Sequence, residues 1–403
     1  MSLIKRFRTW WQPPRNAGNR LEHRQVTFLE LFYDLVYVAL IAELSHTLSS
    51  DLTWAGLGAF AFLFLTVWWA WLNGTTYHDL HGNNDIRTRV FTFLQMLTVV
   101  AMAVFAHTAL GEGSVGFALS YAAFQLILTW LWWRTGVHDP NHRVLSRPYT
   151  ISFLITTALF VGSVFVPTPT RFYLWGIAVI FSLLQPFVMV ITGRINPKAQ
   201  EQIDLTSPVS PSFVERFGLI TIIVLGEVIV GVVGGLTGSH HLEWNTAIIG
   251  LLGGLIAIGL WWVYFDLISH HLPIQNTKNI GAWYYLHLPV TIGITTIGAS
   301  LLHIIEHGGM HIASEAVWIL ALSISVTLLA TAALSRSIQI LPEHQAVHTV
   351  ARRALIVSAL LVVTLGFLEL AIIPFLGIVV ILLLSPVFFA LRFWVEHFGE
   401  VEI

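Results

Sequence analysis

Residues 28–46 read FLELFYDLVYVALIAELSH, and this stretch decides the class of fold. It is apolar enough to lie in lipid, yet it carries Glu30, Asp34 and Glu43. A carboxylate exposed to lipid is so costly that it must face a cavity or a partner. The stretch therefore predicts a transmembrane helix whose acidic side chains point away from lipid.

The composition of the whole chain agrees with this interpretation. Of 403 residues, 56% are hydrophobic and 10% are charged, whereas soluble domains have about 25% charged residues. Apolar runs of about 20 residues, the length that crosses a bilayer as a helix, recur along the chain. They are continuous and do not alternate with polar residues, which excludes a β-barrel pattern. We predict an all-α polytopic membrane protein.

The hydropathy pattern predicts about twelve spans, the last two separated by Pro374 alone. Their expected ranges are 26–48, 53–73, 88–110, 115–134, 149–166, 170–193, 212–235, 244–268, 280–305, 313–334, 351–372 and 374–395. With the N-terminus in the cytoplasm, every Lys and Arg except Arg171 lies on or next to the cytoplasmic side. Cytoplasmic loops are enriched in these residues, so both termini are expected to be cytoplasmic. No cleaved signal peptide is expected.

The two halves of the sequence resemble each other. FLELF at 28–32 matches FVERF at 213–217, and WWAWLNGTTYH at 68–78 matches WWVYFDLISHH at 261–271. Because each half has six spans, we predict two parallel six-helix repeats related by a pseudo-twofold axis along the membrane normal. The expected organisation is a basic N-terminal segment (1–25), repeat one (26–193), a cytoplasmic linker (194–211), repeat two (212–397) and a short tail (398–403).

Acidic residues on the first and seventh spans are the main candidates for a functional path. Helical spacing puts Glu30, Asp34 and Tyr37 on one face of the first span. Intramembrane carboxylates are functional candidates by default, and the alternative for Glu30 and Glu215 is helix capping or pairing with Arg87, Arg89 or Arg216. The candidates for lining a path or binding an ion are Glu30, Asp34, Tyr37, Glu43, Glu215 and Glu227.

A second set of polar residues lies near the expected cytoplasmic ends of the second and eighth spans. Such groups could form an ion-binding vestibule or relay protons near neutral pH. The alternative is a solvated loop whose side chains bond to helix ends, and a buried histidine such as His287 is more often a hydrogen-bonding group than a ligand. The set comprises Asn73, His78, Asp79, Asp85, Arg87, Asp266, His271 and His287.

Metal and cofactor signals are weak. The chain has no cysteine, which removes thiolate chemistry and cysteine metal ligands. His303, His307 and His311 form a weak metal candidate, because His residues at i and i+4 can share a metal on a helix face. Gly308 and Gly309 are expected to end that helix, which weakens the pattern. No cofactor is predicted.

Several of these motifs resemble a known family. FLELFYDLVYVALIAELSH, WWAWLNGTTYHD, YYLHLP and ERFGLITIIVLGEVI are similar to the bacterial low temperature requirement protein A (LtrA) family over nearly the whole chain. The resemblance implies a multi-pass protein of the bacterial inner membrane and brings no established activity. FYDLVY also resembles, more faintly, the start of the first helix in endolysosomal potassium channels built from six-helix repeats.

These observations favour a transport protein, channel-like or carrier-like, with spans one and seven lining a path for a cation or proton, because carboxylate rings favour cations. One alternative is an intramembrane enzyme acting on a lipid or isoprenoid-like substrate; the enzyme question stays open, leaning against. Another is a non-catalytic membrane scaffold for cold adaptation. The expected partners are the bilayer and a small ion or solute, a homodimer is left open, and nucleic acid is not expected.

Overall fold

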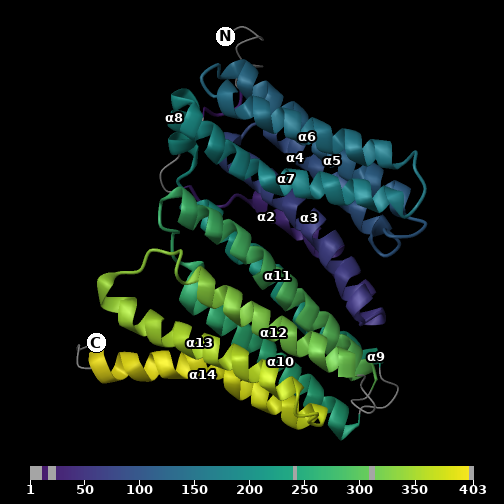
Figure 1. Ribbon diagram of the computed structural model, residues 1–403, viewed down its shortest axis with the longest axis vertical. Helices are drawn as coiled ribbons and strands as arrows, with labels where there is room; N and C mark the ends of the chain where they lie inside the picture. Colours follow the sequence, from purple (N-terminus) through teal and green to yellow (C-terminus); the bar gives the residue numbers. More distant parts are fainter. Residues whose placement is uncertain (1–10, 17–23, 239–242, 308–313, 399–403) are drawn as a thin grey trace. The chain divides into compact units, whose positions relative to one another are not determined.

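The computed structural model describes residues 11–16, 24–238, 243–307 and 314–398. Within these ranges every regular element is helical, and the only β-type pairing is an isolated bridge between Pro273 and Ile338. This confirms the predicted all-α class (Figure 1).

The helices of the described ranges follow the predicted order of spans. They are α2 (Phe28–Ser50), α3 (Trp54–His81), α4 (Ile86–Ala106), α5 (Ser114–His138), α6 (Arg143–Ser163), α7 (Thr170–Ile195), α8 (Pro197–Thr206), α9 (Pro211–Gly238), α10 (Trp244–Tyr264), the π-helix η1 (Phe265–Ser269), α11 (Thr277–Glu306), α12 (Ser314–Leu334), the 3₁₀ helix η2 (Pro342–His344), α13 (Gln345–Gly366) and α14 (Ile372–Phe398).

Eleven helical segments of the described chain are long and apolar enough to cross a membrane. Helix α2, which carries the three carboxylates of the opening stretch, occupies the position of the remaining predicted span but is not among the eleven. A polytopic α-helical membrane protein is thus supported, and α2 is a predicted span that falls outside this set.

Two predicted connections differ from the structure. The predicted break at Pro374 is wrong, because α13 ends at Gly366 and α14 already begins at Ile372. Proline is tolerated in the first turn of a helix, since N–H groups there have no intrahelical acceptor. The segment 194–211 contains the short helix α8, which begins at Pro197 with the Asn196 side chain accepting a hydrogen bond from Lys198 N.

Hydroxyl groups inside the long helices are satisfied within their own helix. Thr66, Thr129, Thr221 and Thr295 each donate to the backbone carbonyl four residues earlier, at 2.8 to 2.9 Å. This pattern hides the hydroxyl from an apolar environment without needing another helix. The many Ser and Thr residues of the spans are therefore compatible with membrane burial and do not by themselves indicate a polar channel.

The chain divides into two compact units. The first comprises the described residues up to Glu43 with Phe62–Phe213, and the second comprises Leu44–Ala61 with the described residues from Val214 onward. In the first, α4 packs on α5, α5 on α6 and α6 on α7; in the second, α11, α12, α13 and α14 pack in sequence and α14 returns to α10 (Figure 1). The twofold relation between repeats stays a prediction.

Helices α9 and α11 of the second unit approach each other at a pair of glycines. A Cβ atom on Gly231 would lie 2.7 Å from the carbonyl oxygen of Gly298, and one on Gly298 would lie 3.1 Å from the carbonyl oxygen of Glu227. Real Cβ atoms are essentially never found as close as 2.7 Å, so Gly231 is required for this separation, and the contact at Gly298 would be tight. The crossing places the backbone of Glu227 directly against α11.

Candidate functional site

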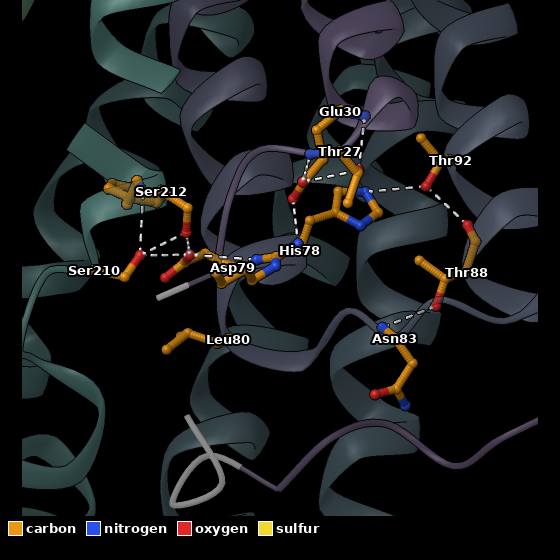
Figure 2. A network of polar contacts seen from close by, with 12 residues as sticks. Thr27, Glu30, His78, Asp79, Leu80, Asn83, Thr88, Thr92, Ser210 and Ser212 are labelled. Atoms are coloured by element: carbon orange, nitrogen blue, oxygen red, sulfur yellow. Dashed lines mark hydrogen bonds and ion pairs between the residues drawn. The ribbon is translucent and has the colours of Figure 1, made fainter. Parts of the chain in front are cut away.

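Glu30 lies at the N-terminus of α2, where it is 5% exposed. Its carboxylate accepts hydrogen bonds from Thr27 N and Thr27 Oγ1, both at 2.9 Å, while Glu30 N donates to Thr27 Oγ1 at 3.3 Å (Figure 2). This reciprocal pair is a capping box. The Arg24 guanidinium adds an ion pair at 2.5 Å. Glu30 therefore caps the N-terminus of α2, and it forms an ion pair with Arg24.

Asp79, near the end of α3, contacts side chains from other parts of the first unit. Its Oδ1 accepts from Ser210 Oγ at 2.7 Å and from Ser212 Oγ at 3.1 Å, and it lies 3.4 Å from Arg24 Nη1 (Figure 2). Arg24 thus joins Asp79 to Glu30. The cluster joins the segment before α2 and the start of α9 to the end of α3.

The segment 12–15 lies along the same end of α3. Arg15 N donates to the carbonyl of His81 at 3.1 Å, and the Arg15 guanidinium donates to the carbonyls of Asp79 and Leu80. These carbonyls belong to the last turn of α3, where no intrahelical donor remains and a positive charge is favourable. Asn83 Nδ2 donates to Pro13 O at 2.7 Å. The N-terminal segment therefore caps α3.

Asp34 is the deeper carboxylate of α2 and is 2% exposed. Trp71 Nε1, from α3, donates to Asp34 Oδ1 at 2.8 Å. Beside it, Tyr37 OH lies 3.2 Å from Tyr33 OH, and the two rings are 5.3 Å apart. The structure thus brings two of the predicted path residues, Asp34 and Tyr37, into a buried polar region between α2 and α3.

His78 and Asn73 also lie on α3 and are buried. His78 Nε2 lies 2.9 Å from Gln95 Oε1 and 3.5 Å from Thr92 Oγ1, both on α4 (Figure 2). Asn73 Nδ2 donates to the carbonyl of Trp69 at 2.8 Å, within its own helix. His78 therefore joins α3 to α4, whereas this bond of Asn73 stays within α3.

Asp85 and Arg87 mark the start of α4. Asp85 Oδ1 accepts from Thr88 N at 3.1 Å and from Thr88 Oγ1 at 2.6 Å, and its Oδ2 accepts from Gln12 N at 2.8 Å. Asp85 is the N-cap of this helix. Arg87, 1% exposed, has its Nε 3.9 Å from Asp85 Oδ2, beyond hydrogen-bond distance.

A histidine cluster lies where α3, α5 and α6 meet. The rings of His81 and His142 are 4.9 Å apart, and both contact Trp132. His142 Nδ1 lies 3.2 Å from Gln202 Oε1 of α8. Burial lowers the pKa of His142 below its ordinary value, and the hydrogen bond to Gln202 and the charge of Asp139 oppose that shift without cancelling it. The imidazole is therefore neutral near pH 7.

In the second unit, Glu227 lies on α9, sixteen residues after the helix begins at Pro211. It is 5% exposed. Within the described chain no donor makes a hydrogen bond or an ion pair with its carboxylate. Glu227 lies well inside a long apolar helix, four residues before Gly231 of the Gly231–Gly298 crossing.

The other predicted residues of α9 and η1 lie elsewhere. Glu215 and Asp266 are exposed at the surface of the second unit, and so is Glu43 of α2 in the first. His287 is fully buried, with its Nε2 3.0 Å from Tyr264 OH and its Nδ1 2.7 Å from Trp283 O. The structure therefore does not gather the predicted acidic residues into one cluster within either unit.

His271 also belongs to the second unit. Its ring lies 5.2 Å from that of His348 at the start of α13. Burial and the neighbouring His270 lower the pKa of His271, with a smaller opposing contribution from a hydrogen bond to Ile268. His271 is thus a packing partner of α13.

The predicted metal candidate is only partly described. The rings of His303 and His307 are 4.2 Å apart, but His303 Nδ1 is 2.8 Å from Ser49 O and His307 Nδ1 is 2.7 Å from His303 O. His311 lies outside the described residues. Among those that are described, no group of three or more His, Asp or Glu side chains is placed to hold a metal ion.

Several contacts were missing from the sequence interpretation. The pattern Thr27-x-x-Glu30 is a capping-box signature and could have been recognised. Trp71 as the partner of Asp34, and Ser210 and Ser212 as partners of Asp79, could not, because they are separated by 37, 131 and 133 residues. Such pairs depend on how helices pack, which no local spacing encodes.

Comparisons with known proteins identify the family of the chain and a relative. A family model described as "Bacterial low temperature requirement A protein (LtrA)" matches residues 25–390. The chain is also 27% identical over 304 residues to "Uncharacterized protein RA0937" of Rhizobium meliloti (strain 1021), covering 72% of this chain and 71% of that protein.

Proposed function

Because the chain belongs to the bacterial low temperature requirement A family, we propose that it is a membrane transport protein that moves a proton or another small cation. The family description names a low temperature requirement and no reaction. The proposal therefore depends on the chemistry of the helices themselves, and above all on α9.

The observation that carries the proposal is Glu227. A carboxyl group buried inside a long apolar helix is costly, and one with a purely structural role is expected to be paired or hydrogen-bonded. Glu227 is 5% exposed and has no such partner among the described residues. A carboxyl group in this condition is free to accept a proton or to bind a cation and release it again.

Asp34 is the corresponding candidate in the first unit. It is buried on α2, with Trp71 Nε1 at 2.8 Å. A carboxylate inside a membrane-spanning helix is a functional candidate by default. Glu30 differs, because Arg24 and Thr27 hold it in a capping role. We therefore assign a role in transport to Asp34 and Tyr37 in the first unit and, separately, to Glu227 in the second.

The proposed location is the bacterial cytoplasmic membrane, with both termini on the cytoplasmic side. Eleven apolar helical segments support a multi-pass protein. The concentration of Lys and Arg in alternate loops supports the orientation. The expected partners remain the bilayer and a small ion or solute.

Flux through purified protein in liposomes tests this proposal. Gradients of protons, potassium and sodium are imposed separately on wild-type protein and on the double variant Asp34→Asn/Glu227→Gln. We expect flux of at least one of these cations in wild type and its loss in the double variant. Glu201→Gln is the matched control, because Glu201 is an exposed carboxylate on α8, outside the membrane-spanning helices.

Two results would contradict the proposal. One is the absence of flux of all three ions through wild-type protein that is folded in the same liposomes. The other is an unchanged flux in the folded double variant. Either result would favour the intramembrane enzyme, and bound lipid in the purified protein would then be the next measurement.

A further inference from the structure

Two tyrosine hydroxyl groups form a buried pair between α2 and α3 in the first unit. Tyr33 and Tyr37 are both buried, and their hydroxyl oxygens are joined by a hydrogen bond of 3.2 Å. A hydroxyl group donates one hydrogen bond and accepts others at the same time. The pair can therefore take up a proton at one oxygen while it releases another from the next.

Asp34 adjoins Tyr37, the inner member of the pair. It precedes Tyr37 by three residues, and side chains at i and i+3 of a helix are neighbours on one face. Trp71 Nε1 donates to Asp34 Oδ1 at 2.8 Å, and the positive hydrogen of this N–H group disfavours a metal cation at the same oxygen. Metal-cation filters use rings of carbonyl or carboxylate oxygens, whereas the contacts described here come from an indole and from phenols. This chemistry favours a proton.

His78 adjoins Tyr33, the outer member. A Cβ atom on Gly74 would collide with the Tyr33 hydroxyl, so this hydroxyl lies directly against the backbone of α3. His78 is four residues after Gly74 on the same face, and a helical side chain leans back over the turn before it. The rings of Tyr33 and His78 accordingly meet edge-on, with centroids 5.8 Å apart. His78 Nε2 donates to Gln95 Oε1 at 2.9 Å, which puts the lone pair that can take a proton on Nδ1.

These groups follow one another in depth from a common end of the two helices. Arg24, before α2, contacts Asp79 near the end of α3, so the start of α2 and the end of α3 lie together. At the rise of an α-helix, Tyr37 is about 14 Å and Tyr33 about 8 Å from the start of α2, and His78 is about 5 Å from the end of α3. The order runs from the interior toward that end.

We propose that the transported cation is a proton and that the hydroxyl groups of Tyr37 and Tyr33 relay it. The inference rests on the proposed transport function and names its substrate. Asp34 releases its proton to the Tyr37 oxygen while the Tyr37 hydroxyl proton moves to the Tyr33 oxygen. The Tyr33 hydroxyl proton moves to His78 Nδ1. Each hydroxyl ends with one proton, Asp34 ends as a carboxylate, and His78 ends as an imidazolium that releases its proton toward the end of α3.

Proton flux into liposomes, followed with an entrapped pH-indicator dye, tests this inference. Tyr33→Phe and Tyr37→Phe each remove one hydroxyl group and keep the ring. We expect each to reduce the proton flux of wild type by about tenfold, the effect of one lost hydrogen bond. Tyr173→Phe is the matched control and should keep the wild-type flux, because Tyr173 is 68% exposed on α7.

Two further variants separate the relay from packing. Gly74→Ala displaces the Tyr33 hydroxyl without removing it and should also reduce proton flux, whereas Gly58→Ala on the same helix should not, because a Cβ there meets nothing within 4 Å. His78→Gln keeps a polar amide but cannot carry the proton. Unfolding midpoints identify the variants that fold. Replacing H₂O by D₂O should slow wild-type flux, which a merely structural role of the hydroxyl groups would not cause.

The outcomes distinguish this inference from the transport function. Absence of flux of protons, potassium and sodium in folded wild-type protein would overturn both. Potassium or sodium flux without proton flux would leave transport in place and overturn the assignment of the proton. Proton flux at the wild-type rate in folded Tyr33→Phe or Tyr37→Phe would overturn the relay. If neither tyrosine variant folds, wild-type proton flux in His78→Gln overturns it.

Discussion

Asp34 is a carboxylate inside an apolar helix, and Trp71 is one of the residues that contact it. The indole N–H of Trp71 is 2.8 Å from Asp34 Oδ1, and the carboxylate is 2% exposed. Hydrogen bonds to charged groups are stronger than those between neutral groups. The bond joins α2 to α3, so its loss should affect both the charge and the packing of these helices.

Replacing Trp71 by Phe tests the contribution of this bond. Trp71→Phe removes the N–H donor to a buried carboxylate, and we expect a loss of about 1–3 kcal/mol in the free energy of unfolding. The measurement is unfolding of the purified protein in detergent. The control is Trp133→Phe, because Trp133 is 56% exposed on α5. Equal stability of the two variants would contradict a structural role for the bond.

His142 gives the protein a pH-dependent stability. Burial lowers its pKa in the folded state, with His81, Trp132, Gln202 and Asp139 around it. The unfolded chain, with a His pKa of about 6.5, then binds the proton first as the pH falls. Stability is therefore full above about pH 6.5 and decreases below it, toward the lowered folded pKa.

The pH profile of the unfolding midpoint between about pH 5 and pH 8 measures this effect. We expect a steeper decrease below about pH 6.5 in wild type than in His142→Gln, which cannot be protonated. Identical slopes for the two proteins would show that His142 does not contribute to the pH dependence.

At the level of residues, a local contact could be predicted from the sequence, whereas long-range partners could not. Thr27 and Glu30 are three positions apart, so their capping box is local. Trp71 and Asp34 meet only because α2 and α3 pack together. Glu30 forms an ion pair with Arg24, a partner that the sequence analysis did not name.

At the level of elements, the crossing of α9 and α11 is the contact that positions Glu227. Gly231 and Gly298 allow backbone to approach backbone without an intervening side chain. A wider separation would move the backbone of Glu227 away from α11. The two glycines thus determine how closely α11 approaches the part of α9 that carries Glu227.

Gly231→Ala should separate these helices. Its Cβ would meet the carbonyl oxygen of Gly298 at 2.7 Å, and overpacking of this kind costs about 1–3 kcal/mol. Gly226→Ala is the control on the same helix, because a Cβ there meets nothing within 4 Å. Thermal unfolding compares the two variants, and a Gly231→Ala protein as stable as Gly226→Ala would contradict the close crossing.

The elements themselves were largely predictable, because continuous apolar runs specify long helices. Their ends were less so. Pro374 looked like a break but lies in the first turn of α14, and α8 begins inside the predicted linker through the Asn196 cap. Helix α2 was predicted as a span although it carries three carboxylates, which oppose the hydropathy of its other residues.

At the scale of the whole molecule, the orientation in the membrane is a proposal that the cysteine-free sequence makes easy to test. Single cysteines at Asn141, between α5 and α6, and at Glu112, between α4 and α5, lie in loops at opposite ends of α5. We expect a membrane-impermeant maleimide to label Glu112→Cys in intact cells and Asn141→Cys only after lysis. The reverse pattern would place the termini outside.

The membrane class and the family could be predicted for the whole molecule, whereas the path could not. The composition indicates the membrane class, and motifs along nearly the whole chain indicate the family. A path depends on which faces of the two compact units meet water, and the acidic residues differ in burial: Asp34 and Glu227 are buried, and Glu43 and Glu215 are exposed.

The most direct measurement is cation flux through Glu227→Gln alone, in liposomes that contain equal amounts of folded wild type, Glu227→Gln or Glu201→Gln. A buried carboxyl group that takes part in transport cannot be replaced by an amide without losing its charge and its proton. The account predicts loss of flux in Glu227→Gln and wild-type flux in Glu201→Gln. Flux through Glu227→Gln at the wild-type rate would contradict it.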